Sequence, residues 1–317
     1  MIEQPIHFAP YLKSVIWGGE RIAPYKGITT TQEQIGESWE LSAVPGHVSV
    51  VDRGPLAGKT LTELIDEYKE QLVGKPNYEK YGNNFPLLVK LIDARADLSV
   101  QVHPDDELAF KRHNCPGKTE MWHIIETAPD ARIYAGLSEQ ITPDEYEKRV
   151  ADNTIMDVIA GYDSTAGDTF YLPAGRIHAI GAGNLLAEIQ QTSDITYRIY
   201  DYDRRDKDGN PRELHTEQAR DAIDYTVYPT YKSDPVGDDL ANCKYFDVRR
   251  MNLSSVSQAV NHDRDSFTII MCLHGEGEIN YSGDAPVHIR QGETLLFPAT
   301  MTDISASGLG ELITVQS

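Results

Sequence analysis

One eight-residue pattern occurs twice in this chain. Residues 167–174 read GDTFYLPA, and residues 292–299, which start 125 positions later, read GETLLFPA. Each copy has the composition of a turn, a short strand and a proline stop, and the shared Gly, acidic residue, Thr, apolar triplet and Pro-Ala predict two related β domains. The copies then diverge, because the fifth residue after the proline is His178 in the first copy and Asp303 in the second.

The first copy, together with the residues that follow it, resembles a motif of a known superfamily. The string GDTFYLPAGRIH at residues 167–178 resembles the second conserved motif of cupins, small jelly-roll barrels that hold a metal near the barrel mouth. The resemblance predicts a mainly β fold of two cupin-like jelly-roll β-barrels with a few attached α-helices. We expect residues 1–235 to form an N-terminal catalytic cupin domain with helical elements. Residues 236–317 would form a C-terminal cupin-like domain without a metal site, because its metal histidine is lost.

Local patterns along the chain agree with this fold class. Helical signals are few, and they predict helices at residues 61–72, 142–159 and 216–225,. Thr60 with Glu63 and Thr142 with Pro143 are the expected helix starts. Short runs rich in Val, Ile, Tyr and Thr, bounded by Gly, Pro, Asn and Asp, predict strands at residues 86–92, 98–103, 120–126, 169–172, 195–202, 267–273 and 293–297,.

The composition is that of a folded chain with one large or two modest domains. It has 317 residues, 40% of them hydrophobic,. There is no apolar run of about 18 residues and no basic segment followed by an apolar one at the N-terminus, so we expect no membrane span and a cytoplasmic location. Cys115, Cys243 and Cys272 are widely separated, which argues against a disulfide framework or a thiolate metal cluster,.

The net charge restricts the partners. A value of −20 argues against a nucleic-acid partner, since phosphate backbones are bound through clustered Lys and Arg,. If the substrate is itself a phosphate, the field of the whole protein repels it. A local concentration of positive charge is then required at the site.

Four residues form the predicted metal site. Gln101 and His103 lie two apart on an expected strand, so both side chains project from the same face,. Glu120 and His178 would complete the set. Two imidazoles and one carboxylate, with a fourth position left for an amide oxygen, water or substrate, are typical of a catalytic zinc site rather than a structural one.

Six blocks of the sequence, in order, resemble those of the type I mannose-6-phosphate isomerases, also called phosphomannose isomerases. The resemblance is strong over residues 8–205 and weak over the C-terminal cupin, and the chain length suits the short bacterial form of the family. The blocks are residues 11–19 (YLKSVIWGG), 35–42 (IGESWELS), 101–106 (QVHPDD), 118–120 (KTE), 173–178 (PAGRIH) and 196–201 (TYRIYD).

The resemblance implies an activity and a set of roles. It implies a zinc-dependent isomerase that interconverts mannose 6-phosphate and fructose 6-phosphate through an enediol or enediolate. One Zn²⁺ per chain would be held by His103, Glu120 and His178, with Gln101 as the fourth ligand. Arg198 would be the catalytic arginine. Lys118 would be the active-site lysine, although residues 115–119 (CPGKT) depart from the longer enzymes at this point.

Two cations are predicted to act on the substrate. Lys90 lies in an apolar strand, where a lysine is costly inside a barrel unless it is paired with an anion,. We therefore prefer a contact with phosphate or a substrate hydroxyl over a surface position at a strand edge. Arg198 can hold phosphate in a bidentate manner or steady the enediolate. The alternative is a structural ion pair with Asp201 or Asp194.

The sequence does not choose among the candidates for the general base. It is Lys118, a metal-bound water, or an uncoordinated carboxylate such as Glu37 or Glu188. Glu37 and Trp17 are also predicted to contact the substrate. Trp17, Trp39 and Trp122 are expected to be core or pocket-wall residues, and four histidines are not expected to bind metal: His113, His123, His215 and His274.

Other functions also fit a cupin with this ligand set. One is an isomerase that acts on another sugar phosphate. Another is a metal-dependent oxygenase that uses the same ligands; the identity of the metal separates this function, because zinc cannot supply redox chemistry. A third is a non-catalytic sugar-binding cupin. Loss of a metal ligand, the lysine or the arginine would mark that third case, and this chain keeps all of them.

Overall fold

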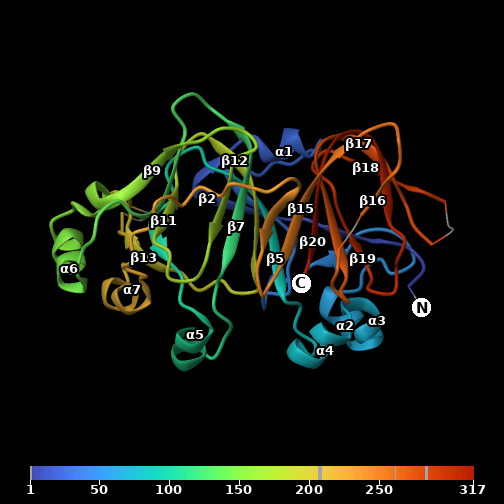
Figure 1. Ribbon diagram of the computed structural model, residues 1–317, viewed down its shortest axis with the longest axis horizontal. Coiled ribbons are helices and arrows are strands. Elements are labelled where there is room, and N and C mark those ends of the chain that lie inside the picture. The colour runs from blue at the N-terminus through green and yellow to red at the C-terminus, as the bar shows by residue number, and fades with distance from the viewer. Residues whose placement is uncertain (1, 206–208, 261, 283–284) are drawn as a thin grey trace.

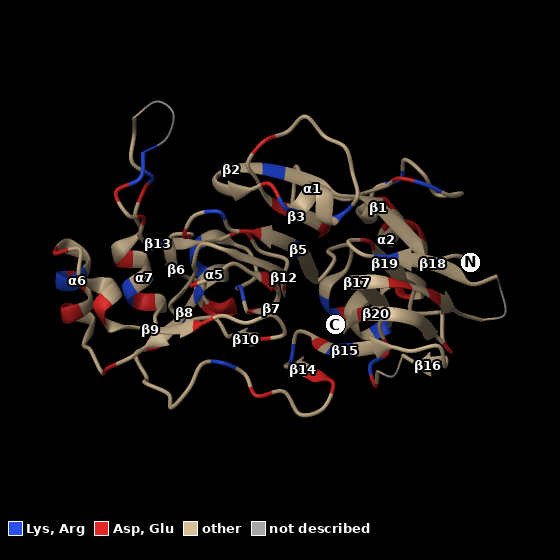
Figure 2. Ribbon diagram, turned by 90° about the horizontal axis from the view of Figure 1, so that it is seen from above, with Lys and Arg blue, Asp and Glu red and all other residues tan. Residues whose placement is uncertain are grey.

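The protein folds into two β lobes that lie side by side (Figure 1). The structure, a computed structural model, describes residues 2–205, 209–260, 262–282 and 285–317. The mainly β fold predicted from the sequence is confirmed, with a few helices attached around the sheets. Acidic and basic residues are scattered over both lobes (Figure 2). Within the described residues, none of the helices is both long and apolar enough to cross a membrane.

Two sheets build the first lobe. The larger runs β10-β7-β12-β5-β3-β2 and the smaller runs β13-β6-β11-β8-β9. The strands of the larger sheet are β2 (Tyr11–Gly19), β3 (Ile35–Leu41), β5 (Leu87–Asp93), β7 (Glu120–Thr127), β10 (Thr169–Leu172) and β12 (Asn184–Gln191). Those of the smaller sheet are β6 (Val100–Val102), β8 (Arg132–Leu137), β9 (Ile159–Asp163), β11 (His178–Ile180) and β13 (Tyr197–Tyr200).

A single nine-stranded sheet builds the second lobe, and the start of the chain contributes to it. Its order is β14-β15-β20-β17-β19-β1-β4, with β16 on β20 and β18 on β17. In the strand β1, Ile6 pairs with Leu296 of β19. The strands are β1 (Ile6–Ala9), β4 (Val50–Val51), β14 (Asp239–Asn242), β15 (Asp247–Leu253), β16 (Gln258–Ala259), β17 (Thr268–Asn280), β18 (Val287–Arg290), β19 (Thr294–Phe297) and β20 (Ser305–Gln316).

The repeated octapeptide forms the same local structure in both lobes. The first copy contains β10 and the second contains β19, and each strand pairs antiparallel with a longer strand. Leu172 pairs with Glu120, and Phe297, its counterpart in the repeat, pairs with Thr268. The second lobe therefore has a threonine where the first lobe has the predicted metal carboxylate.

The helices lie on the outside of the lobes. In Figure 1, α2, α3 and α4 lie below the second lobe, whereas α6 and α7 lie at the outer end of the first. Contacts fix the first group there, because Asn77 of α4 donates to the Ser266 hydroxyl, and the ring of Phe85, just after α4, lies 4.4 Å from that of Phe267. The helices are α1 (Ile22–Tyr25), α2 (Leu61–Tyr68), α3 (Glu70–Val73), α4 (Lys75–Tyr81), α5 (Asp106–His113), α6 (Pro143–Ala151) and α7 (Thr216–Ala222).

The three predicted helices exist, but each is shorter than expected. The single helix over residues 61–72 is wrong, because Lys69 adopts a φ of 51° and separates α2 from α3. The helix over residues 142–159 ends at Ala151, since Asn153 has a φ of 56°, and a 3₁₀ turn and β9 follow. The third ends at Ala222, where the backbone becomes extended. Left-handed residues of this kind end a helix whatever the propensity of the residues beyond them.

The predicted cap of α2 is present and gives a stability test. The Thr60 hydroxyl accepts from the Glu63 N–H at 3.2 Å, and the Glu63 carboxylate accepts from the Thr60 N–H at 2.8 Å. We expect Thr60→Ala to lower the free energy of unfolding by about 1 kcal/mol in a urea titration, because the N–H loses its acceptor. Thr60→Ser keeps the hydroxyl and should retain most of that stability; equal losses in both variants would contradict the assignment.

Candidate metal centre and active site

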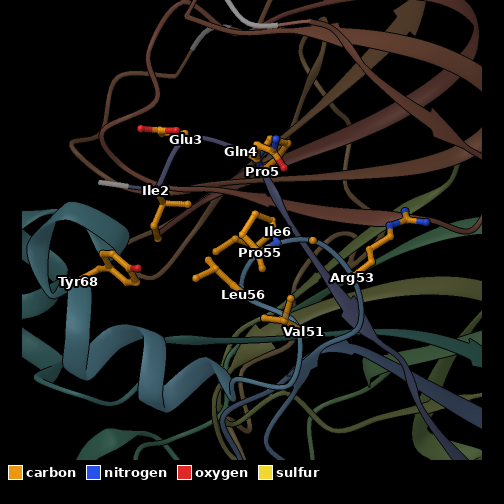
Figure 3. A pocket seen from close by; sticks show the side chains of 11 residues that line it. Ile2, Glu3, Gln4, Pro5, Ile6, Val51, Arg53, Pro55, Leu56 and Tyr68 are labelled. Carbon is orange, nitrogen blue, oxygen red and sulfur yellow. The ribbon is translucent and has the colours of Figure 1, made fainter.

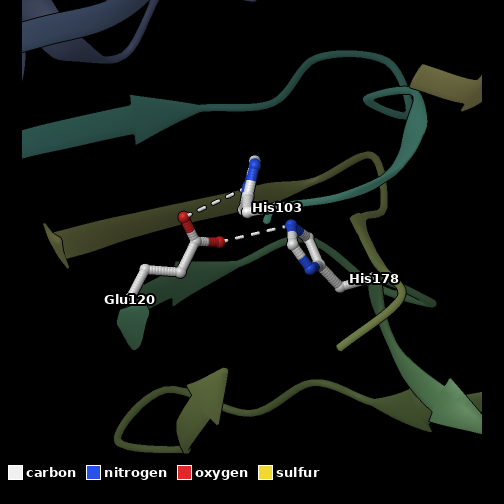
Figure 4. Close-up of side chains that lie close together, drawn as sticks. All are labelled: His103, Glu120 and His178. Carbon is white, nitrogen blue, oxygen red and sulfur yellow. Dashed lines mark ion pairs between the residues drawn. The ribbon is translucent and has the colours of Figure 1, made fainter. Parts of the chain in front are cut away.

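Three side chains from three strands converge inside the first lobe. Glu120 is the first residue of β7, His178 is the first residue of β11, and His103 directly follows β6. Glu120 Oε2 lies 3.5 Å from His103 Nε2, and Oε1 lies 3.3 Å from His178 Nε2 (Figure 4). All three residues are at most 2% exposed. In the described part of the chain, no other group of three His, Cys, Asp or Glu residues is close enough to hold a metal ion.

Backbone carbonyls orient both imidazoles. His103 Nδ1 lies 2.9 Å from the Ile195 carbonyl oxygen, and His178 Nδ1 lies 2.8 Å from that of Arg176. A carbonyl oxygen only accepts, so each Nδ1 donates a proton and each Nε2 turns its lone pair toward Glu120. Burial and the nearby Lys118 ammonium lower the pKa of His103 well below its ordinary value and that of His178 to about 3. Both rings are therefore neutral, as metal ligands must be.

The three side chains leave buried polar atoms without partners. Glu120 Oε1 and His178 Nε2 make no hydrogen bond with any described residue. Burial raises the pKa of the Glu120 carboxyl to about 7, against the opposing effect of Lys118. Buried polar atoms without partners are costly, and a divalent cation between two imidazoles and a carboxylate would satisfy them. The residues present therefore fit a metal ion.

Lys118, the predicted active-site lysine, lies beside this group. Its side chain is buried, and Nζ lies 2.7 Å from Glu120 Oε2 and 3.1 Å from His103 Nε2. The ammonium thus meets two of the three ligand atoms, which shows that this end of the lobe attracts positive charge. The segment before Glu120 is held in place because Thr119 N–H donates to Gln191 Oε1.

A pocket adjoins the metal-binding group. Gln101 pairs with His178 on one side and with Arg198 on the other, so it lies in the row of strands that carries the ligands. Its side chain faces the pocket together with residues from both sheets. The lining residues are Lys13, Trp17, Glu37, Trp39, Lys90, Ile92, Gln101, Lys118, Glu188, Asp194 and Thr196.

A buried ion network lines the middle of this pocket. Lys90 Nζ lies 2.8 Å from Glu188 Oε2 and 3.7 Å from Glu37 Oε2. Burial alone would raise the pKa of Glu188, but the charges of Lys90 and Lys118 lower it to about 2, and Lys90 lowers that of Glu37 in the same way. Both carboxylates are therefore ionised and hold the Lys90 ammonium charged inside the lobe. They offset the free-energy cost of burying a lysine inside the barrel.

Indole N–H groups complete the network. Trp39 Nε1 donates to Glu37 Oε2 at 2.7 Å, and Trp122 Nε1 donates to Glu188 Oε1 at 2.9 Å. Trp17 and Trp39 line the pocket, while Trp122 is fully buried behind it and meets the edge of the His178 ring. The prediction that these tryptophans are core or pocket-wall residues is confirmed.

The structure does not bring Arg198 into the pocket lining. Its Nη1 donates to the Glu213 carbonyl oxygen at 2.9 Å, and its Nε is buried without a partner among the described residues. The alternative pairing with Asp201 is not present either, because Asp201 binds Arg204 and Arg212 instead. Arg198 lies on β13, where it pairs with Gln101 of β6. Its catalytic role stays a prediction.

Sequence reasoning did not assign four of the lining residues to the site: Lys13, Ile92, Asp194 and Thr196. Lys13 and Thr196 lie inside the sequence blocks quoted above, but nothing in their local pattern separates a pocket residue from a surface one. Glu188 did have a sequence signal for a buried functional position, because it is the sole charged residue in the strand β12. Lys90 has the same signal, since it lies between apolar residues in the middle of β5. The two face each other across those strands.

A separate pocket lies near the start of the chain. It is lined by residues 2–6, by part of the segment 51–56 and by Tyr68 (Figure 3). Most of this lining is apolar, and Arg53 is at its border. None of the predicted site residues lines it.

Comparisons with known proteins identify the family. The family model described as "Phosphomannose isomerase type I, catalytic domain" matches residues 6–145, and the one described as "Mannose-6-phosphate isomerase, cupin domain" matches residues 238–317. The chain is 36% identical to the mannose-6-phosphate isomerase ManA of Bacillus subtilis, over 99% of both chains. It is 33% identical to a mannose-6-phosphate isomerase of Streptococcus mutans, over 99% of this chain and 98% of the other.

Solved structures agree with these matches. A crystal structure of mannose 6-phosphate isomerase from Bacillus subtilis superimposes with a TM-score of 0.88 and 32% identity, covering 99% of this chain and all of the other. A mutant phosphomannose isomerase from Salmonella typhimurium gives a TM-score of 0.83 over 99% of both chains at 16% identity, which supports the fold alone. Full-length identity above 30%, together with the two family models, shows that this chain belongs to the type I mannose-6-phosphate isomerases.

Proposed function

We propose that the protein is an aldose-ketose isomerase that interconverts D-mannose 6-phosphate and D-fructose 6-phosphate and uses one Zn²⁺ per chain. The observation that carries the proposal is the buried His103, Glu120 and His178 group beside a pocket lined by charged side chains. Two inward atoms of this group, Glu120 Oε1 and His178 Nε2, have no hydrogen-bond partner among the described residues. Two imidazoles and one carboxylate suit zinc in a catalytic site, and the Gln101 amide oxygen is our choice for the fourth ligand.

The reaction requires a proton to leave C2 of the aldose and return at C1, through an enediol or enediolate. A divalent cation bound at this site would stabilise negative charge as it develops on the substrate oxygens. The protein's own contribution is a fixed arrangement of charges around the carbon atoms that react. We assign to Lys90, held by Glu188 and Glu37, the binding of substrate hydroxyls, and to the walls of Trp17 and Trp39 the exclusion of water.

Of the open choices for the proton carrier, Lys118 Nζ is the one we propose. Glu37 already accepts from Lys13 and Trp39, and Glu188 already accepts from Lys90 and Trp122, so both oxygens of each carboxylate are already hydrogen-bonded to a donor. Arg198 is kept as a second group that would steady the enediolate from the neighbouring strand.

We also propose that catalysis belongs to residues 1–235 and that residues 236–317 carry no metal site. The repeat supports this division, since Thr268 stands at the position of Glu120. Asp303 stands at the position of His178. A threonine and an aspartate cannot reproduce the neutral imidazole and the carboxylate of the first lobe.

The test is isomerisation of mannose 6-phosphate by the purified protein, measured by coupled detection of fructose 6-phosphate, together with elemental analysis. We expect about one zinc per chain, loss of activity after chelation and recovery when zinc is added back, because the cation would supply the charge that stabilises the developing oxyanion. A metal-loaded protein that forms no fructose 6-phosphate would overturn the substrate assignment. Activity that survives complete removal of metal would overturn the role of the ion.

A further inference from the structure

One pocket lysine differs from the other two in its surroundings. Lys13 lies on β2, the edge strand of the six-stranded sheet, which runs along the outside of the first lobe (Figure 2). Its side chain is 39% exposed, whereas those of Lys90 and Lys118 are 9% and 6% exposed. Lys13 is therefore at the rim of the pocket, and the other two lysines lie deeper in it.

The position of Lys13 is well defined by its neighbours. It pairs across the strands with Glu37, and Nζ lies 3.1 Å from Glu37 Oε1. Nζ also lies 5.2 Å from the centre of the Trp39 ring, which Lys90 approaches at 5.4 Å. An ammonium has three donors, so one contact with Glu37 leaves others directed away from it. The side chain is thus held over the pocket with unused hydrogen-bonding capacity.

The remaining cations of the site are already engaged. Lys90 is enclosed by Glu188 and Glu37, and Lys118 faces Glu120 and His103. A phosphate dianion is strongly hydrated, and its transfer to a buried position is expensive. The rim, where water still reaches the group, is the place where a phosphate costs least to bind while the sugar carbonyl extends inward to the metal-binding group. The chain's net charge of −20 makes a local cation necessary there,.

We propose that Lys13 binds the phosphate of the substrate at the pocket rim and thereby makes the site selective for phosphorylated sugars over free sugars. This inference rests on the proposed isomerase function and names the group that recognises the phosphomonoester. It assigns the two ends of the pocket: the rim binds the phosphate, and the buried end holds the carbons that react.

The test compares Lys13→Met, Lys13→Arg and Lys59→Met in steady-state kinetics with mannose 6-phosphate. Lys59 is a matched control, since it is 40% exposed, is paired with Glu67 and does not line the pocket. We expect Lys13→Met to raise KM roughly 10- to 100-fold, the usual effect of one charged hydrogen bond, with kcat changed less than about threefold. Lys13→Arg should restore KM to within a few-fold. Lys59→Met should match the unmodified protein.

A second readout separates phosphate binding from a role through Glu37. Inorganic phosphate should inhibit competitively, and its inhibition constant should rise in Lys13→Met by the same factor as KM, whereas inhibition by unphosphorylated mannose should not change. An unchanged KM, or a fall in kcat alone, would overturn the inference. Equal weakening of inhibition by phosphate and by mannose in Lys13→Met would also overturn it, because that pattern means that Lys13 only positions Glu37.

Failure of the proposed function is distinguishable from failure of this inference. If the unmodified protein does not isomerise mannose 6-phosphate, the function is wrong, but calorimetric binding of mannose 6-phosphate and of mannose still tests Lys13. Weaker binding of the phosphorylated sugar alone in Lys13→Met supports the rim assignment. Equal binding by both proteins refutes it.

Discussion

Glu120→Gln is expected to abolish isomerisation and to strip the protein of its metal. Glutamine keeps the shape of the side chain but removes the negative charge that stands between the two imidazoles, 3.5 Å from His103 and 3.3 Å from His178. With only neutral ligands left, affinity for a divalent cation falls, and kcat/KM should drop by roughly 10³-fold or more. The measurements are the coupled assay and the zinc content after dialysis.

Glu126→Gln is the matched control for this variant. Glu126 lies on the same strand, β7, but its side chain is exposed at the far end. We expect it to retain full activity and one zinc per chain, so that a fall in both variants would point to damage of the strand. If Glu120→Gln kept its zinc and its activity, the metal would have to be bound elsewhere.

Lys90→Met is expected to cost both stability and activity. The substitution leaves Glu188 buried and ionised without its main partner, since Lys90 Nζ supplies the 2.8 Å contact to Oε2. Breaking one half of a buried ion pair typically costs about 3–5 kcal/mol in the free energy of unfolding. The lost ammonium should also lower kcat/KM by roughly 10²-fold or more, as loss of a preorganised charge does in other active sites.

The double variant Lys90→Met with Glu188→Gln separates the two effects. It removes the unpaired negative charge of Glu188, while the glutamine oxygen can still accept from Trp122 Nε1. We expect urea unfolding to show that most of the lost stability returns, with activity as low as in the single variant. Recovery of both quantities together would mean that Lys90 serves the fold and not the reaction.

The residues that could hold a metal ion could be predicted from the sequence because their signals are local. Strand alternation places Gln101 and His103 on one face, and the turn that follows Pro173 brings His178 to the start of a strand,. The contact between Lys90 and Glu188 is different in kind. The two residues are 98 apart in the chain, and they meet because β5 and β12 pair in one particular register. Local pattern predicts the strands but not their register.

The helix ends could not be predicted from the sequence, because they too depend on contacts between distant segments. Nothing in the composition of residues 61–72 requires Lys69 to adopt a left-handed conformation. That conformation lets α3 turn back so that the Leu72 carbonyl oxygen accepts from the Ala299 N–H of the second lobe. The break is imposed by packing between segments far apart in the chain, and helix propensity is too weak a preference to resist it.

The pairing of β1 with β19 sets a limit on when this protein can finish folding in a cell. Ile6 and Leu296 are opposite each other in the sheet, and 290 positions of chain separate them. At ordinary rates of translation, the first strand waits on the order of 15 to 60 s before its partner is made. During that interval β1 has only the short strand β4 beside it, and Ile6 lacks its partner in the sheet, although Ile6 and Phe8 are both buried at the end. The residues of β1 are thus made long before those of β19 but are among the last to reach their final place.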